Sequence, residues 1–265
     1  MNYKILNEKC EETIQRLINA NQKIDVILTS PPYNTSRNNN GKRSMDNYEA
    51  RYDVYFDLGT QQDYINWITE LFNNFDKILA ENGVVLWNVS YGNDTTVNTN
   101  GLGTMWLSIA DIIQNSPFTV ADRIIWKKKS ALPNNVSPNK LTRICEDVFV
   151  FCRKTELKTF NANKEVSKVG KNGQTFYKNY YNFVEAKNND GSCDLNKATY
   201  SSELCTQLLS LYAKSGNVIF DPFNGTGTTA ISCVDLNMNY LGSEISADQC
   251  EYSINRINKY IEERK

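Results

Sequence analysis

The stretch VIFDPFNGTGTTA, residues 218–230, decides the fold class of this 265-residue chain. Its apolar start predicts a buried strand that ends in an acid, Asp221, turns through Gly225 and Gly227, and enters a helix. Small residues let the backbone approach a ligand closely, and the amide end of a helix favours an oxygen-bearing group. The next predicted strand ends in Glu244, 17 residues after Gly227, where a carboxylate can accept hydrogen bonds from ribose hydroxyls. The stretch therefore predicts a nucleoside-cofactor site in an α/β fold.

The class of cofactor stays open at this point. Gly225, Gly227 and Ala230 also fit the looser G-x-G-x-x-A pattern of a dinucleotide fold, so an NAD- or FAD-linked oxidoreductase is a candidate. A turn with two glycines does not decide the question alone.

Strand and helix alternate on both sides of this turn. Strands are predicted at 3–6, 25–30, 84–90, 121–127, 146–154, 217–222 and 240–245, and helices at 10–20, 62–83, 105–116, 201–216, 227–237 and 247–265. This order predicts a doubly wound, Rossmann-like sheet, with residues 1–265 in one domain.

A second distinctive stretch is TSPPYN, residues 29–34, at the end of the strand predicted for 25–30. Pro31 and Pro32 cannot donate to a sheet ladder and cannot lie inside a helix, so they impose a rigid corner. A hairpin corner alone would account for Ser30, the two prolines and Tyr33. The corner implies chemistry only if the rest of the chain supplies a reaction.

Charge is nearly balanced overall but unevenly distributed. The chain has 29 Lys and Arg residues against 30 Asp and Glu residues. Residues 123–187 contain 14 basic and 5 acidic residues, a net charge of +9, and the remainder carries −10. Such segregation favours an anionic partner over a merely solvated surface.

Cysteine and histidine usage argues against a metal centre. The seven cysteines form no CxxC pair and the chain has no histidine, so no metal site is expected. The sequence shows no signal-peptide pattern and no apolar run long enough to cross a membrane. Scattered cysteines suit a reducing compartment, and we expect a cytoplasmic protein without a membrane partner.

Two regions depart from the α/β rhythm. Residues 34–59 are dense in Asn, Arg, Lys and Gly and predict a mobile surface loop after the proline corner. Residues 155–197 lose periodicity and are rich in Lys, Asn and Tyr, which indicates an insertion rather than core.

The two motifs together resemble a known enzyme family. FDPFNGTGTT resembles the cofactor motif, and TSPPYN the catalytic motif, of the S-adenosylmethionine-dependent DNA amino-methyltransferases of restriction–modification systems. The catalytic motif precedes the cofactor motif, which is the circularly permuted order of the β group. The resemblance covers most of the chain. It implies methylation of an exocyclic amine in a short duplex sequence, with N4 of cytosine slightly favoured over N6 of adenine.

In that reaction the proline corner would orient the amine that receives the methyl group. An exocyclic amine is a poor nucleophile because its lone pair is delocalised into the ring. Acceptors aimed at its N–H groups, the Ser30 side chain and the Pro31 carbonyl, would hold it out of the ring plane, with Pro32 fixing the angle. Tyr33 would stack on the base once it is flipped from the duplex. C5-cytosine methylation needs a nucleophilic cysteine, usually after a proline, and no cysteine here follows one.

The resemblance also implies the cofactor site. Seven residues would surround S-adenosylmethionine: Asp221, Pro222, Phe223, Gly225, Gly227, Thr228 and Glu244. Two positions depart from the family pattern: Lys9 stands where relatives often have an acid, with Glu8 adjacent, and Asn196 stands where they have a histidine.

Double-stranded DNA is the implied partner. We assign target recognition mainly to an insertion at residues 153–197, and the predicted DNA contacts are Lys127, Lys128, Lys168, Lys171 and Lys178. A homodimer and a cognate restriction endonuclease would be compatible with the resemblance. The alternatives are the oxidoreductase, a glutamine-amide methyltransferase, and a DNA-binding module that keeps the fold without turnover. None of these alternatives accounts for the whole set of motifs as well as the DNA amino-methyltransferase does.

Overall fold

A computed structural model describes residues 2–33, 60–90, 104–133, 135–136, 138, 141–160, 162–191, 193–196 and 199–264. The predicted mobile loop at 34–59 lies outside these residues.

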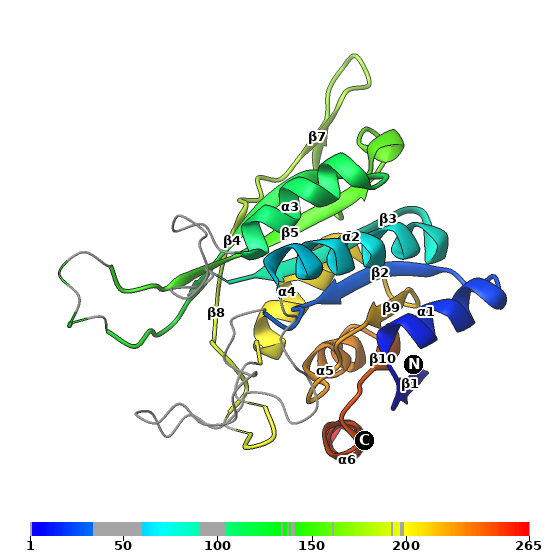
Figure 1. The fold of residues 1–265 in the computed structure, drawn as a ribbon. Coiled ribbons are helices and arrows are strands. Elements are labelled where there is room, and N and C mark those ends of the chain that lie inside the picture. Colours follow the sequence, from blue (N-terminus) through cyan, green and yellow to red (C-terminus); the bar gives the residue numbers. More distant parts are fainter. Residues whose placement is uncertain are drawn as a thin grey trace.

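An eight-stranded sheet forms the centre of the described structure, and a separate hairpin projects beyond it (Figure 1). The strands are β1 (Tyr3–Leu6), β2 (Ile24–Thr29), β3 (Leu79–Val89), β4 (Phe118–Lys128), β5 (Cys145–Arg153), β6 (Val166–Val169), β7 (Thr175–Tyr177), β8 (Phe183–Ala186), β9 (Val218–Asp221) and β10 (Asn239–Ser243). Their order in the sheet is β1-β10-β9-β2-β3-β5-β4-β8, and β6 pairs only with β7. All neighbours are parallel except β3 with β5 and β5 with β4. Strand β5 therefore runs against the other seven.

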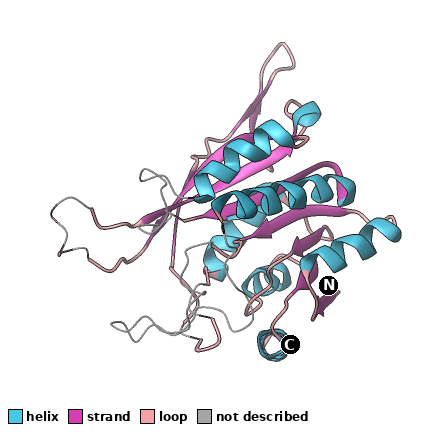
Figure 2. Cartoon of the chain, viewed as in Figure 1, coloured by secondary structure: helices cyan, strands magenta, loops and turns pink. Residues whose placement is uncertain are grey.

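Helices cover both faces of this sheet (Figure 2). They are α1 (Cys10–Asn19), α2 (Gln61–Ile78), α3 (Thr104–Asn115), α4 (Ser202–Tyr212), α5 (Thr228–Asp235) and α6 (Ala247–Glu262), with a short 3-10 helix at Lys154–Glu156. Helices α1 to α3 pack their apolar residues on one face, and α4 to α6 pack on the other. None of the helices within the described ranges is long and apolar enough to cross a membrane.

The two ends of the chain meet in the middle of the sheet. Strand β2 pairs in parallel with β9, so that Val26 lies opposite Ile219 and Ile27 opposite Phe220. The predicted doubly wound sheet is confirmed, and both halves of the chain contribute strands to it. The proline corner after β2 and the glycine turn after β9 therefore leave the sheet at the same edge, the carboxyl ends of the parallel strands.

Two sequence predictions were wrong in detail. Helix α2 begins as its capping box at Thr60 and Asp63 requires, but it ends at Ile78 and not at Gly83. Leu79 is already extended, and the β2–β3 register shifts between Ile24 and Val26. A Cβ on Gly83 would lie 2.9 Å from the Asp25 carbonyl oxygen, so this glycine permits close strand packing instead of ending a helix.

The other difference concerns residues 155–197, which were expected to lie outside the core. Strand β8, within that stretch, pairs with β4 at the end of the central sheet. Its Val184 and Ala186 side chains are buried in the core, because alternate residues of an edge strand face the sheet's apolar side. Among the described residues of 155–197, the β6–β7 hairpin and its flanking loops are the part that projects from the fold.

Candidate active site

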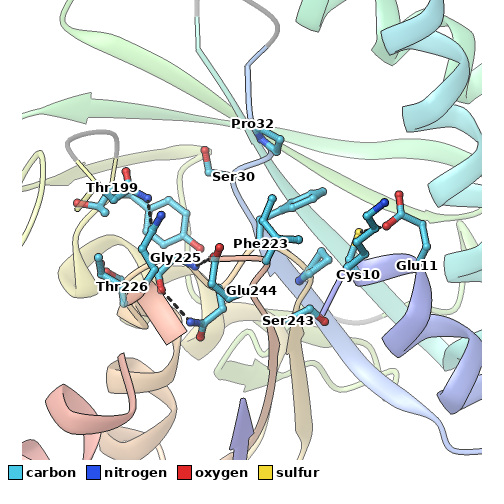
Figure 3. A pocket seen from close by; sticks show the side chains of 18 of the residues that line it. Cys10, Glu11, Ser30, Pro32, Thr199, Phe223, Gly225, Thr226, Ser243 and Glu244 are labelled. Atoms are coloured by element: carbon cyan, nitrogen blue, oxygen red, sulfur yellow. Dashed lines mark hydrogen bonds between the residues drawn. The ribbon is translucent and has the colours of Figure 1, made fainter. Parts of the chain in front are cut away.

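A cavity of about 310 Å³ lies at the carboxyl ends of β2, β9 and β10 (Figure 3). Seven residues predicted from the sequence line it: Ser30, Pro32, Pro222, Phe223, Gly225, Thr228 and Glu244. Further lining residues come from the start of α1, from α2, from the segment before α4 and from α6: Lys9, Cys10, Glu11, Trp67, Asn196, Thr199, Tyr200 and Gln249. The proline corner and the glycine turn therefore open onto one space.

Glu244 holds the glycine turn in place. Its carboxylate accepts a bond of 2.7 Å from the Gly225 N–H and another of 2.9 Å from the Ser246 N–H. Gly225 has φ +52°, a conformation that glycine adopts without strain. This arrangement places a carboxylate and the amino end of α5 on the same cavity wall, which suits the hydroxyls of a ribose and the polar end of a nucleoside cofactor.

Gly227, also predicted to contact the cofactor, does not line the cavity. It has φ +80°, and a Cβ there would lie 2.9 Å from the Ser253 Cβ of α6. Its role in the structure is to let α5 and α6 approach each other. The close packing sets the direction in which α5 presents its amino end.

Asp221 lies buried beneath the turn and likewise does not line the cavity. Its carboxylate accepts bonds from the hydroxyls of Thr29 (2.6 Å), Thr229 (2.7 Å) and Tyr200 (3.2 Å), and from the Phe223 N–H (3.0 Å). Burial raises the pKa of the Asp221 carboxyl, and these hydrogen bonds oppose the rise. Asp221 thus ties strand β2, through Thr29, to the glycine turn and α5.

The proline corner is held in place by a hydrogen bond from helix α2. The Tyr64 hydroxyl of α2 donates to the Pro32 carbonyl oxygen at 3.1 Å, and Pro31 is buried. Ser30 lines the cavity, and its Oγ lies 2.9 Å from the Tyr33 hydroxyl oxygen. Tyr33 itself is half-buried and lies outside the residues that line the cavity.

An aromatic wall was not predicted from the sequence. The Trp67 ring of α2 lies 5.8 Å from the Phe223 ring, which lies 6.3 Å from Trp87, measured between ring centroids. The Trp67 indole N–H donates to Glu11 Oε1 at 2.7 Å. Since Trp67 lies on the apolar side of an amphipathic helix, its sequence context did not distinguish it from a core residue.

The two departures from the family pattern can now be placed. Lys9 and Glu11 both line the cavity, whereas Glu8 does not line it and accepts hydrogen bonds from Thr13 and Arg16 of α1. Of the two acids beside Lys9, Glu11 and not Glu8 therefore lines the cavity. Asn196 also lines the cavity, and its amide donates to Gln249 Oε1 at 3.0 Å.

The predicted DNA-contacting lysines fall into two groups. Lys127 pairs with Glu185 at 2.7 Å, Lys128 pairs with Glu146 at 2.5 Å, and both lie at the carboxyl end of β4. Lys168 and Lys171 lie on the exposed hairpin, where the Lys168 ammonium sits 5.1 Å from the Phe176 ring centroid. Lys178 forms an ion pair with Glu165, which raises the pKa of Lys178 mainly through that hydrogen bond.

Two substrates can meet at this cavity. The wall formed by Glu244 and the glycine turn suits a nucleoside, and Ser30, which lines the same cavity, can accept hydrogen bonds from a second molecule. Fold and site are therefore those of a Rossmann-like enzyme that transfers a group from a nucleoside cofactor.

A family model described as DNA methylase matches residues 24–255, and the chain belongs to this family. The orphan methyltransferase M.BamHII of Bacillus amyloliquefaciens is 27% identical over 267 residues, which cover 90% of each chain. The type II methyltransferase M.BglII of Bacillus subtilis is 23% identical, over 89% of this chain and 64% of its own. Family membership favours the methyltransferase over the oxidoreductase suggested by the glycine spacing.

Solved structures share the fold at low identity. The cytosine-N4-specific PvuII DNA methyltransferase superposes with a TM-score of 0.69 at 15% identity, over 99% of this chain and 91% of that one. The M1.HpyAVI–SAM complex superposes with a TM-score of 0.67 at 19% identity, over 97% of this chain and 99% of that one. The likeness extends over the whole Rossmann-like sheet and its helices.

Proposed function

We propose that this DNA methyltransferase transfers a methyl group from S-adenosylmethionine to an exocyclic amino group in a short duplex DNA sequence. The observation that carries the proposal is the shared cavity, on which Ser30 and Pro32 lie together with Gly225 and Glu244. M1.HpyAVI has been solved as a complex with SAM, which supports the same cofactor for this chain.

The residues of the cavity fit this cofactor. Glu244 offers carboxylate oxygens to ribose hydroxyls, and the aromatic rings of Trp67 and Phe223 provide flat apolar walls. S-adenosylmethionine supplies a methyl group bound to a positively charged sulfonium, so no metal or enzyme nucleophile is needed for its activation.

Ser30 and the Pro31 carbonyl would orient the target amine. Acceptors on its N–H groups hold the nitrogen lone pair out of the base plane and towards the methyl group. The nitrogen–carbon bond forms as the carbon–sulfur bond breaks, the bonding electrons pass to sulfur, and one proton leaves the nitrogen to solvent. The anchoring of Pro32 by Tyr64 keeps this corner from moving as the base enters.

The direct test combines the purified chain with labelled S-adenosylmethionine and genomic DNA that lacks methylation. Label in the DNA supports the proposal. Cofactor binding without labelling of any of several diverse DNAs would instead favour the silent DNA-binding module.

Digestion of the product to nucleosides and mass analysis identifies the base. We favour N4-methylcytosine slightly over N6-methyladenine as the product, because a serine, Ser30, precedes the proline pair.

Tyr33 provides a first mutational prediction. Its ring is proposed to stack on the flipped base, an interaction worth roughly 1–3 kcal/mol in nucleic-acid sites. Tyr33→Ala is expected to slow methylation by about tenfold and to leave S-adenosylmethionine affinity near that of the wild type. Single-turnover methylation and calorimetric cofactor titration measure the two effects. Equal losses in both would place the ring in the cofactor pocket.

DNA contact is proposed for two surfaces of the basic segment. The hairpin carries lysines without an ion-pair partner among the described residues, Lys168 and Lys171, beside exposed Tyr177. However, the hairpin leads into the amino end of β8, opposite the edge that holds Ser30. Lys127 and Lys128 lie at the edge of Ser30 but are already paired with carboxylates. We propose target recognition by residues 153–197 with support from this edge.

Lysine replacement on the hairpin tests that assignment. Lys168→Ala with Lys171→Ala is expected to weaken DNA binding and to reduce the log–log salt slope by up to about 1.8, about 0.9 for each phosphate that the variant no longer neutralises. The matched control replaces Lys4 of β1 and Lys259 of α6, two exposed lysines at the end of the sheet opposite β8. Cofactor affinity should not change in either variant. A wild-type salt slope in the hairpin variant would move the phosphate contacts to the edge at Lys127 and Lys128.

A second copy of the chain and a restriction endonuclease of the same specificity are further proposed partners. Sedimentation with and without DNA tests the first. Protection of methylated DNA against candidate endonucleases tests the second.

A further inference from the structure

Five polar side chains form a connected group at the catalytic edge of the sheet. The Asn88 amide nitrogen, near the end of β3, lies 3.0 Å from the Tyr33 hydroxyl and 3.5 Å from Ser30 Oγ. The same nitrogen donates to Glu146 Oε2 of β5 at 2.9 Å. Glu146 Oε1 accepts from the Lys128 ammonium of β4 at 2.5 Å. The group thus reaches from the proline corner across three strands.

This group is mostly withdrawn from water. Asn88 is 2% exposed, and the Glu146 and Lys128 side chains are 12% and 24% exposed. The Lys128 ammonium also lies 4.9 Å from the Trp126 ring centroid, which fixes it above β4. Polar contacts in such surroundings are strong when made and costly to break.

Glu146 determines how the Asn88 amide faces the catalytic pair. An ionised carboxylate only accepts hydrogen bonds, so the side of the amide that meets it must be the NH2 group. That same nitrogen is the atom nearest Tyr33, so the tyrosine oxygen receives a hydrogen bond there. Within the described residues Asn88 Oδ1 accepts no hydrogen bond. The orientation of the Asn88 amide is therefore set mainly by the hydrogen bond from its nitrogen to Glu146.

We propose that Glu146 and Asn88 are positioning residues for methyl transfer. Glu146, held by Lys128, fixes the Asn88 amide, and Asn88 in turn fixes the Tyr33 hydroxyl against Ser30. The pair then presents one arrangement of donors and acceptors to the target amine. This inference rests on the proposed function, because it needs Ser30 and Tyr33 to meet the base. The competing interpretation is that the group only joins three strands.

Glu146→Gln tests the proposal with little change of shape. A glutamine can donate to Asn88 Oδ1, so the asparagine amide can turn over and present oxygen to Tyr33 instead of nitrogen. We expect single-turnover methyl transfer at saturating DNA to fall by about tenfold, since small misplacement of reacting groups is costly. Affinity for S-adenosylmethionine should stay at the wild-type value.

Asp147→Asn is the matched control. Asp147 is the next residue of β5, and it pairs with Arg123 at 2.7 Å on the other side of the strand. The change is the same, a carboxylate to its amide in an ion pair of the same sheet. If the Glu146 group only joined strands, the two variants would lose thermal stability to a similar extent and neither would lose its transfer rate.

A double-mutant cycle separates positioning from stability. In a Tyr33→Phe background the hydroxyl that Asn88 holds is absent, so Glu146→Gln should slow transfer much less than in the wild type. An equal slowing in both backgrounds, or a wild-type rate for Glu146→Gln, overturns the proposal. If Glu146→Gln does not fold, Asn88→Ala replaces it with the same expected results. Absence of methylation by the wild-type protein would refute the proposed function itself and is seen before any variant is made.

Discussion

Replacement of Ser30 by alanine is expected to slow methyl transfer roughly 100-fold, the largest effect on turnover among these variants. Ser30 lines the cavity, and its Oγ lies 2.9 Å from the Tyr33 hydroxyl. Alanine cannot accept a hydrogen bond from the target amine, which would then stay conjugated with its ring. The Pro31 carbonyl is retained, so activity should not vanish. A 100-fold loss corresponds to about 2.7 kcal/mol of transition-state stabilisation.

Single-turnover labelling at saturating DNA measures this effect, and calorimetry measures cofactor affinity, which should stay within about twofold of the wild type. Ser210→Ala is the control. Its hydroxyl donates to the Thr206 carbonyl within α4, away from the cavity, and its loss should leave the rate unchanged. If Ser30→Ala transfers methyl groups at the wild-type rate, the amine is held by other groups and the catalytic role of the corner is refuted.

The sequence predicted the site best where a motif is local. The strand, acid and glycine turn of 218–230 follow one another in the chain, and the prolines after β2 restrict the backbone by themselves. Both motifs can therefore be recognised without knowledge of the tertiary structure. Their meeting at one cavity followed from the direction of parallel strands, and the β2–β9 pairing confirmed it.

Which residues of the 218–230 motif line the cavity, and which support it, could not be predicted from the sequence. Asp221 and Gly227 belong to the same motif as Gly225, yet they lie beneath and beside the cavity and not on it. Which residue of a turn meets the ligand depends on the rotation of the following helix, and α6 packing against Gly227 sets that rotation. A spacing pattern contains no information on this contact.

Residues contributed by distant elements were missed for a different reason. Trp67 and Glu146 have ordinary positions within an amphipathic helix and a strand, and only the assembled sheet brings them near the corner. Asn88 did carry a signal: a polar side chain within the apolar run VVLWNVS is buried, and a buried polar group needs partners. An interrupted apolar strand is therefore the sequence feature that could have indicated this group.

Replacement of Asp221 by alanine is expected to lower the free energy of unfolding by about 3 kcal/mol, the largest effect on stability. Three hydroxyls and the Phe223 N–H donate to this carboxylate, which is 2% exposed. The hydroxyls can rotate to other acceptors, but the N–H cannot. Thr29→Val removes a single donor and should cost about 1 kcal/mol.

Urea denaturation followed by circular dichroism measures both changes, and Asp122→Ala, at an exposed position of β4, is the control with little expected effect. A loss for Asp221→Ala no greater than for Asp122→Ala would contradict the assignment of Asp221 as the tie between β2 and α5.

The isosteric variant Asp221→Asn adds a pH signature. Burial raises the pKa of Asp221 in the folded protein, so the folded state retains the proton to higher pH than the unfolded state does. Its favourable contribution is complete below the ordinary aspartate pKa of about 3.9 and is lost as pH rises through the folded-state value. Asparagine has no such contribution. The difference in unfolding free energy between wild type and Asp221→Asn should therefore shrink as pH rises through this interval. A difference that grows with pH would mean that the four donors outweigh burial and hold the carboxylate charged.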